Sequence, residues 1–419
     1  MRTQSFRSVR TNKASALILL LLIFSAAAHG ADTEKQLHSF NDTRGNEPAG
    51  PVIFDAAGNL YGVTQSGGVY NGGVAFMLSK NSGGVWTETV LHNFGNTKID
   101  DGKTPLLNLI FDSAGNLYGT TLAGGTSNVG TVYELSPAGG GKWTESILYD
   151  FEGKIGSPSA DGASPEAGLI FDPEGNLYGT TVEGGYSQKG VAYELSPVAG
   201  GGWNETLLWE FGAGTDGANP NGALIFDSLG NLYGTTANGG VNNYGTAFEL
   251  SPAGGEWTET ILYKFGSSGD DGIYPLSSLV FDSAGNLYGT TSGGGTKGYG
   301  TVFQLSPASG GVFSEDILHN FEGGNYGFQP EEEQLAFDSS GNLYGTTLQG
   351  GAHGAGIIFE LSPSAGGHWT EKLVHAFGVG TDGTAPFSGV TLDSAGNLYG
   401  TTLGGGSAGG YGLVYEIIP

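Results

Sequence analysis

The sequence predicts an all-β protein: a seven-bladed β-propeller of four-stranded antiparallel blades, closed by the N-terminal strand. The motif (Phe/Leu)-Asp-x-x-Gly-Asn-Leu-Tyr-Gly occurs seven times, and its aspartates are 55 to 60 positions apart. A period of this length fits one four-stranded blade and no common helical repeat. The last copy lacks a fourth strand, and a matching strand stands near the start of the chain.

Composition supports a sheet-rich repeat protein. Glycine supplies 79 of the 419 residues and charged residues only 13%, so long helices are disfavoured. Hydrophobic residues make up 38% of the chain and recur regularly, which is enough to bury a core between repeats.

The first thirty residues have the pattern of a signal peptide. Four basic residues precede an apolar run over 14–28, and Ala28-His29-Gly30 offers small residues for cleavage after Gly30. The alternative is an uncleaved membrane anchor, but the apolar run is shorter than the roughly 20 residues that a spanning helix needs. We therefore expect a signal peptide at 1–30, a single propeller domain at 31–419, and a secreted or periplasmic location.

The processed chain is strongly acidic. The leader holds four of the 15 basic residues and none of the 41 acidic ones, which leaves 11 basic against 41 acidic residues and a formal charge of −30. Such a charge repels nucleic acid and anionic membranes, so neither is an expected partner. The chain contains no cysteine, which excludes disulfides, thiolate chemistry and a lipoprotein anchor.

The second repeat unit illustrates the expected strands in order. Residues 107–111 form an apolar strand, 112–116 a tight turn, and 117–121 the antiparallel partner strand. In the turn, Asp112 is expected to accept the backbone N–H two residues on, and Gly115 to supply a positive φ. A third strand over 131–136 ends before Pro137, and a fourth covers 145–151.

The fourth strand predicts how the ring closes. Its last four positions hold, in order, an apolar residue, an aromatic residue or His, any residue, and Phe. Six copies end at Phe94, Phe151, Phe211, Phe265, Phe321 and Phe377. A seventh copy, Leu37 to Phe40, opens the processed chain, whereas the last unit stops after a third strand at 413–418. We expect the opening strand to complete the last blade, with this strand type outermost and the first strand lining the central channel. An open β-solenoid is the main alternative, although it would not need a displaced strand.

These motifs resemble a known family. The repeat unit is similar to the GloVer tandem repeats of exported bacterial choice-of-anchor proteins. It consists, in order, of Asp-Gly-x-x-Pro, an apolar strand, Asp-x-x-Gly-Asn-Leu-Tyr-Gly-Thr-Thr, a Gly-Gly loop and a strand that ends with Leu-Ser-Pro. The resemblance covers almost the whole processed chain and implies a surface or extracellular location, with no implied activity. The chain departs from it by ending at Pro419 without a sorting segment, so release or a periplasmic location is as compatible as anchoring. The hairpin is more loosely similar to NHL-type and lactonase-like propellers.

The connections between blades contain the main candidate ligands. Five of them carry Asp-Gly shortly before Pro, and their aspartates are Asp101, Asp161, Asp216, Asp271 and Asp382. If these loops gather around one mouth of the channel, the carboxylates can bind a polar ligand such as a glycan, or calcium at Asp101, Asp216 and Asp271. The alternative is that each Asp caps its own turn before a rigid Pro. No other cofactor is expected.

The fifth connection breaks the repeat. It carries Tyr326 where those five have Asp, and an acidic cluster follows that includes Glu331 and Glu332. A specific ligand-binding site is therefore expected near these three residues.

Histidines and aromatic residues at repeated positions fit packing roles. His38, His92, His319 and His375 share one position with Tyr149, Trp209 and Tyr263, and no zinc-binding spacing is present. The regular tryptophans and the tyrosines of the hairpin could stack on sugars, but their periodicity favours packing between blades. The sequence has no phosphate-binding loop and no nucleophile elbow.

These observations favour a monomeric, exported, non-catalytic module that binds carbohydrate or another cell-surface component. The alternative is an enzyme, a glycan lyase, hydrolase or lactonase, with calcium and carboxylates at the channel mouth. An enzyme should break the repeat symmetry in one pocket, whereas a scaffold should keep its loops interchangeable.

Overall fold

The computed structural model describes residues 33–153, 161–309, 311–331 and 334–419, so the leader expected at 1–30 lies outside the described residues. The regular secondary structure of the described part is almost entirely β-strand, with one short 3-10 helix, η1 (Gly324–Tyr326). No helix in these described ranges is long and apolar enough to cross a membrane.

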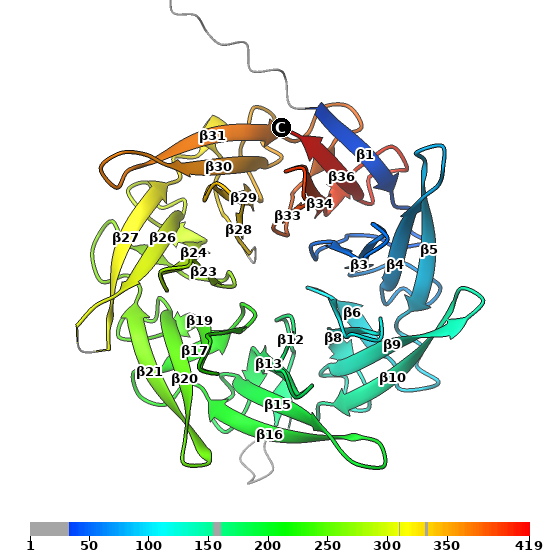
Figure 1. Ribbon diagram of the computed structural model, residues 1–419, viewed down its shortest axis with the longest axis horizontal. Coiled ribbons are helices and arrows are strands. Elements are labelled where there is room, and N and C mark those ends of the chain that lie inside the picture. The colour runs from blue at the N-terminus through cyan, green and yellow to red at the C-terminus, as the bar shows by residue number, and fades with distance from the viewer. Residues whose placement is uncertain (1–32, 154–160, 310, 332–333) are drawn as a thin grey trace, which may run out of the picture. The chain divides into compact units, whose positions relative to one another are not determined.

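Seven antiparallel four-stranded blades stand around a central axis, as predicted (Figure 1). We number them in chain order, from blade 1 (β2 to β5) to blade 7 (β33, β34, β36 and β1). In every blade the first strand of the hairpin motif is innermost. The strand that is followed by the repeated Phe is outermost.

The strands occupy equivalent places in the seven blades. The innermost strands are β2 (Ile53–Phe54), β7 (Ile110–Phe111), β12 (Ile170–Phe171), β18 (Ile225–Phe226), β23 (Val280–Phe281), β28 (Ala336–Phe337) and β33 (Thr391–Leu392). The second strands are β3 (Leu60–Thr64), β8 (Leu117–Gly124), β13 (Leu177–Thr181), β19 (Leu232–Gly239), β24 (Leu287–Thr291), β29 (Leu343–Thr347) and β34 (Leu398–Thr402). The third strands are β4 (Val74–Lys80), β9 (Thr131–Gly139), β15 (Val191–Pro197), β20 (Thr246–Ala253), β26 (Thr301–Pro307), β30 (Ile357–Pro363) and β36 (Leu413–Ile418). The outermost strands are β5 (Trp86–Asn93), β10 (Lys142–Asp150), β16 (Trp203–Glu210), β21 (Glu256–Lys264), β27 (Phe313–Asn320), β31 (Trp369–Ala376) and β1 (Thr33–Ser39).

The segments that link one blade to the next form short additional pairs with the chain that follows each hairpin. The pairs are β6 (Gly102–Pro105) with β8, β11 (Gly162–Ala163) with β14 (Glu183–Gly184), β17 (Gly217–Pro220) with β19, β22 (Gly272–Ile273) with β25 (Gly293–Gly294), and β32 (Gly383–Thr384) with β35 (Gly404–Gly405). Each link therefore crosses the far end of the second strand, opposite the hairpin turn.

The hairpin turn has the expected chemistry. In blade 2, Asp112 Oδ1 accepts the backbone N–H groups of Ala114 at 2.9 Å and Asn116 at 2.8 Å. Gly115 has a φ of 87°, a left-handed conformation that glycine adopts without steric cost. The turn contacts are confirmed, but only two residues of the expected first strand over 107–111 pair in a ladder. The third strand of this blade also continues past Pro137, because Pro137 pairs with Trp143 at a shift in strand register.

The N-terminal strand closes the ring as predicted. β1 pairs antiparallel with β36, from Thr33 opposite Ile418 to Ser39 opposite Leu413. An ion pair of 2.9 Å between Lys35 and Glu416 lies on the same pair of strands. The first and last described strands therefore belong to one blade, and the open-solenoid alternative is excluded.

Aromatic side chains fill the spaces between blades. The phenylalanine that follows each outermost strand is almost completely buried and lies edge-on or tilted against a third-strand ring of the next blade, as Phe40 does against Phe76 at 5.0 Å. The tyrosines of the hairpin behave similarly, as Tyr178 does against Phe226 and Trp257. The predicted packing role of these aromatic positions is confirmed.

The last glycine of the hairpin motif is required by this packing. A Cβ atom added to Gly234 would lie 2.6 Å from Cζ of the buried Phe248 and 3.1 Å from Cδ2 of Leu224. We expect Gly234→Ala to lower the free energy of unfolding by about 1–3 kcal/mol, measured by chemical denaturation, because an overpacked core must shift. Gly269→Ala is the matched control, since nothing lies within 4 Å of that added Cβ atom. An equal effect of both substitutions would contradict the packing explanation.

Candidate functional site

A glutamate recurs in the outermost strand of every blade, six residues before the buried phenylalanine. The seven are Glu34, Glu88, Glu145, Glu205, Glu259, Glu315 and Glu371. Each has a buried carboxylate oxygen without a hydrogen-bond partner. Glu88, Glu145 and Glu371 also lie in ion pairs at the interface with the preceding blade. The sequence analysis missed this position, although Glu-x-x-(Leu/Val) repeats there in all seven copies and is the signal that could have revealed it.

The five link aspartates lie beside these glutamates and not around the channel. Asp101 contacts Nε2 of His92 at 3.2 Å, and Asp271 accepts from the Tyr263 hydroxyl at 3.0 Å. His92 and Tyr263 lie on β5 and β21, which are outermost strands. The expected carboxylate ring at the channel mouth is therefore corrected: each link begins where an outermost strand ends, so its aspartate is held at the outer part of one blade interface.

All five aspartates are buried and bound to local backbone. They are 3–8% exposed. Each accepts a backbone N–H from the residues just after the preceding strand, for example Asn96 N–H to Asp101 at 3.1 Å and Ser267 N–H to Asp271 at 2.6 Å. This supports the turn-capping alternative and leaves little surface for a glycan. Whether Asp101, Asp216 and Asp271 bind calcium remains a prediction, but they lie in three different interfaces.

Each of these interfaces holds a buried pair of carboxyl groups. Burial, and then the neighbouring Asp216, raises the pKa of Glu259 to about 9. Burial and Asp271 raise the pKa of Glu315 to about 8, and the Tyr263 hydroxyl opposes this shift. Two carboxylates cannot both remain charged in such a site, so the Glu259 and Glu315 pairs each hold one proton near neutral pH.

One position of the outermost strand, which holds His in some repeats and an aromatic residue in others, contributes a third polar group beside each pair of carboxyl groups. Tyr263 donates to Asp271 at 3.0 Å and to Glu315 at 2.9 Å, and Trp209 Nε1 donates to Asp216 at 3.3 Å. In the interface of blades 1 and 2, His92 takes this place and also lies 3.5 Å from Glu145. The position therefore has a polar role in addition to the predicted packing role.

Two interfaces depart from the pattern. Between blades 7 and 1, Arg44 occupies the Asp position and pairs with Glu88 at 2.9 Å, while His38 lies 3.2 Å from the same carboxylate. Between blades 5 and 6, Tyr326 occupies the Asp position, ends η1 and is 56% exposed.

The structure describes only part of the predicted fifth-link site, namely Tyr326 and Glu331. Glu331 is half-buried, and burial raises its pKa. Glu332 lies outside the described residues. The ligand role predicted for Tyr326, Glu331 and Glu332 remains a prediction.

A groove with aromatic walls lies between blades 3 and 4. It has a volume of about 720 Å³ and lies between the hairpin turns of the two blades. Its lining includes Phe171, Tyr178, Phe226 and Trp257, with Asp172 and Asp227 beside them. Tyr178 and Trp257 are also in ring contact at 6.4 Å.

This groove breaks the repeat symmetry. The corresponding groove between blades 1 and 2 has a volume of about 550 Å³, and its lining includes Phe54 and Phe111 but neither Tyr nor Trp. The turn of blade 3 carries Pro173-Glu174, where most other turns carry small residues. The turn of blade 4 carries Leu229, which is 82% exposed. The sequence analysis did not single out these turn residues.

The sevenfold repeat, the four-stranded blades and the closing N-terminal strand define the class: a tandem-repeat seven-bladed β-propeller. The chain belongs to the Gloeobacter/Verrucomicrobia repeat family, whose model matches residues 22–161 and 156–334. This match confirms the resemblance stated from the motifs. No curated protein matches the chain.

Solved structures confirm the fold. The extracellular domain of a putative hybrid two-component system from B. thetaiotaomicron has a TM-score of 0.54 and 11% identity; the match covers 92% of this chain and 39% of that one. A putative 6-phosphogluconolactonase from Bacteroides uniformis has a TM-score of 0.51 and 12% identity, covering 81% and 86%. An ulvan lyase, a polysaccharide lyase, has a TM-score of 0.50 and 13% identity, covering 91% and 95%. Identities this low show the fold alone.

Proposed function

We propose that the chain is an exported, non-catalytic module that binds carbohydrate in the groove between blades 3 and 4. The observation that carries the proposal is the groove wall, where the partly exposed ring of Trp257 adjoins the carboxylates of Asp172 and Asp227. Sugar rings present C–H faces that pack on aromatic rings and hydroxyl groups that donate to carboxylates. A volume of about 720 Å³ also lies within the usual range of ligand pockets.

The carboxylates of the groove suit hydroxyl donors better than anionic ligands. Burial tends to raise the pKa of Asp227, but hydrogen bonds from the backbone and side chain of Asn231 outweigh this effect and lower it. A carboxylate held in its charged form is a strong acceptor for a neutral sugar. We therefore expect neutral glycans to bind more tightly than sulfated or uronic-acid glycans.

Glycan-array screening of residues 32–419, followed by calorimetry, tests this proposal. Trp257→Ala is expected to weaken binding at least tenfold, about 1.4 kcal/mol, because it removes a wall of the groove. Trp143→Ala is the matched control, since Trp143 contacts Tyr61 in the same way beside a different pair of blades. An equal loss in both variants, or no bound glycan, would refute the groove assignment. Release of cleaved sugar from a bound polysaccharide would refute the non-catalytic part.

Export is tested separately. We expect N-terminal sequencing of the protein secreted by a bacterial host to show cleavage after Gly30. Retention of the uncleaved chain in the membrane fraction would contradict this part of the proposal.

A further inference from the structure

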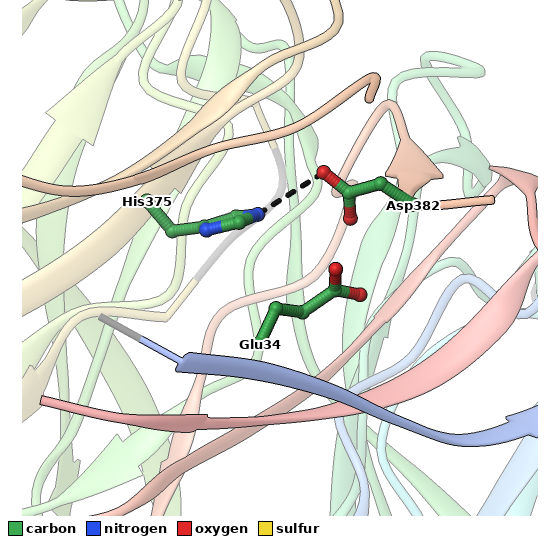
Figure 2. A group of neighbouring side chains, drawn as sticks. All are labelled: Glu34, His375 and Asp382. Carbon is green, nitrogen blue, oxygen red and sulfur yellow. Dashed lines mark hydrogen bonds and ion pairs between the residues drawn. The ribbon is translucent and has the colours of Figure 1, made fainter. Parts of the chain in front are cut away.

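We infer that two blade interfaces bind a divalent transition-metal ion, one through His92, Asp101 and Glu145 and the other through Glu34, His375 and Asp382. Figure 2 shows the second group, in which the three side chains converge from β1, β31 and the link between blades 6 and 7. This site is separate from the proposed glycan groove.

The distances within each group fit a metal site. Each residue offers one ligand atom, and the three atoms lie within 4.8 Å of one another. His92 Nε2 lies 3.2 Å from Asp101 Oδ2 and 3.5 Å from Glu145 Oε2, and His375 Nε2 lies 3.1 Å from Asp382 Oδ2. Ligand atoms about 2.1 Å from a tetrahedral or octahedral ion are themselves roughly 3.0–3.4 Å apart. Small side-chain adjustments would therefore suffice for coordination.

Buried and unsatisfied oxygen atoms provide a second observation. The Glu145 side chain is only 7% exposed, and its Oε1 atom is buried without a hydrogen-bond partner. Glu34 Oε1 is also buried without such a partner. An unsatisfied buried carboxylate oxygen is costly, and a cation between the carboxylates would remove that cost.

The other interfaces of the same molecule show what distinguishes these two. Glu259 and Glu315 also have a buried oxygen without a partner, but Trp209 and Tyr263 occupy the histidine position there. Those interfaces need a shared proton and have no nitrogen ligand. At the interface of blades 7 and 1, the Arg44 guanidinium lies against Glu88 next to His38, so a positive group already fills this position.

The ligand set selects the class of metal. One imidazole nitrogen and two carboxylates suit zinc, cobalt or nickel, whereas calcium prefers six to eight oxygen ligands. Each ion would join the outermost strands of neighbouring blades. At the second site it would also hold Glu34 of the closing strand β1, so metal binding would strengthen ring closure.

Titration of chelator-treated residues 32–419 with Zn²⁺, and with Co²⁺ as a spectroscopic probe, tests the inference. We expect two ions per chain, a rise of several degrees in Tm with Zn²⁺, and visible Co²⁺ absorption bands. Excess Ca²⁺ should not displace Co²⁺. A shared proton is the competing occupant, and absence of bound Zn²⁺ and of Co²⁺ bands would overturn the inference.

Substitutions taken from the repeat itself make the test specific. His92→Tyr and His375→Tyr introduce the residue found at this position between blades 2 and 3 and between blades 4 and 5, so the fold should be retained. Each should remove one ion, and the double variant should bind none. Tyr263→His should create a third site with Asp271 and Glu315. Unchanged stoichiometry in the folded double variant would place the metal elsewhere, for example at the surface residues His353 and His368, and refute the assignment.

Discussion

Removing residues 33–39 is expected to open the ring and cause the largest loss of stability in this protein. The deletion takes away β1, which forms the outer edge of blade 7 and pairs with β36 over six residues of ladder. It also uncovers Leu413, Val414, Tyr415 and Ile417, which are all completely buried. Burial of such side chains contributes about 1.5–3 kcal/mol each, so partial exposure of several should lower Tm by more than 10 °C.

An exposed edge strand gives this prediction a second readout. The free edge of β36 should pair with other chains, so the deletion variant should oligomerise in size-exclusion chromatography with light scattering. A synthetic peptide of residues 32–40, added in trans, should restore both the monomer and part of the lost Tm. A monomeric deletion variant with parental Tm would show that β1 is not required for closure.

The architecture of the ring could be predicted because it depends on local sequence repeated seven times. The turn at Asp112 and Gly115 and the displaced copy ending at Phe40 each needed only nearby residues or a count of copies. The interchange of His92 with tyrosine and tryptophan also indicated packing correctly, since His92 lies edge-on to Phe94 at 4.6 Å. Repetition makes such inferences strong, because a local rule is tested once per blade.

The candidate sites could be predicted only in part, because they form between segments of different blades. Asp101 was singled out, but its position depends on where the link leaves the end of β5, which the spacing of Asp and Pro does not determine. Glu145 was missed because it lies at an alternating position of a half-exposed strand, where a charged residue usually faces solvent. The groove between blades 3 and 4 depends on Tyr178 and Trp257, which are 79 positions apart and meet only after the blades pack.

Stability is expected to be highest near pH 5 and to fall as the pH rises toward 9. Burial raises the pKa of Glu205 to about 7, of Glu315 to about 8 and of Glu259 to about 9, from an ordinary value of 4.5. Between pH 4.5 and these values the folded chain binds more protons than the unfolded chain. The free energy of unfolding therefore decreases by up to about 1.4 kcal/mol per pH unit for each group, until the pH reaches the raised pKa of that group.

The acid side of the profile has the opposite sign. Hydrogen bonds in the hairpin turns outweigh burial and lower the pKa of Asp55, Asp282 and Asp338. Their contribution is present above the ordinary aspartate pKa of 3.8 and is lost as the pH falls through the lowered values. Denaturant unfolding followed from pH 3 to pH 9 should thus show a maximum between the two sets of groups.

Glu259→Gln isolates one carboxyl pair from the rest of the profile. The amide resembles the protonated glutamate and can donate to Asp216, so the variant should match the parent at pH 5. At pH 9 it should be more stable than the parent by up to about 5 kcal/mol, because no proton has to be lost from the buried pair. Glu256→Gln, at an exposed position of the same strand, should stay within about 0.5 kcal/mol of the parent at both pH values. If Glu259→Gln follows the parent at pH 9, then Asp216 and Glu259 do not share a proton in the folded chain, and the alkaline loss of stability must come from elsewhere.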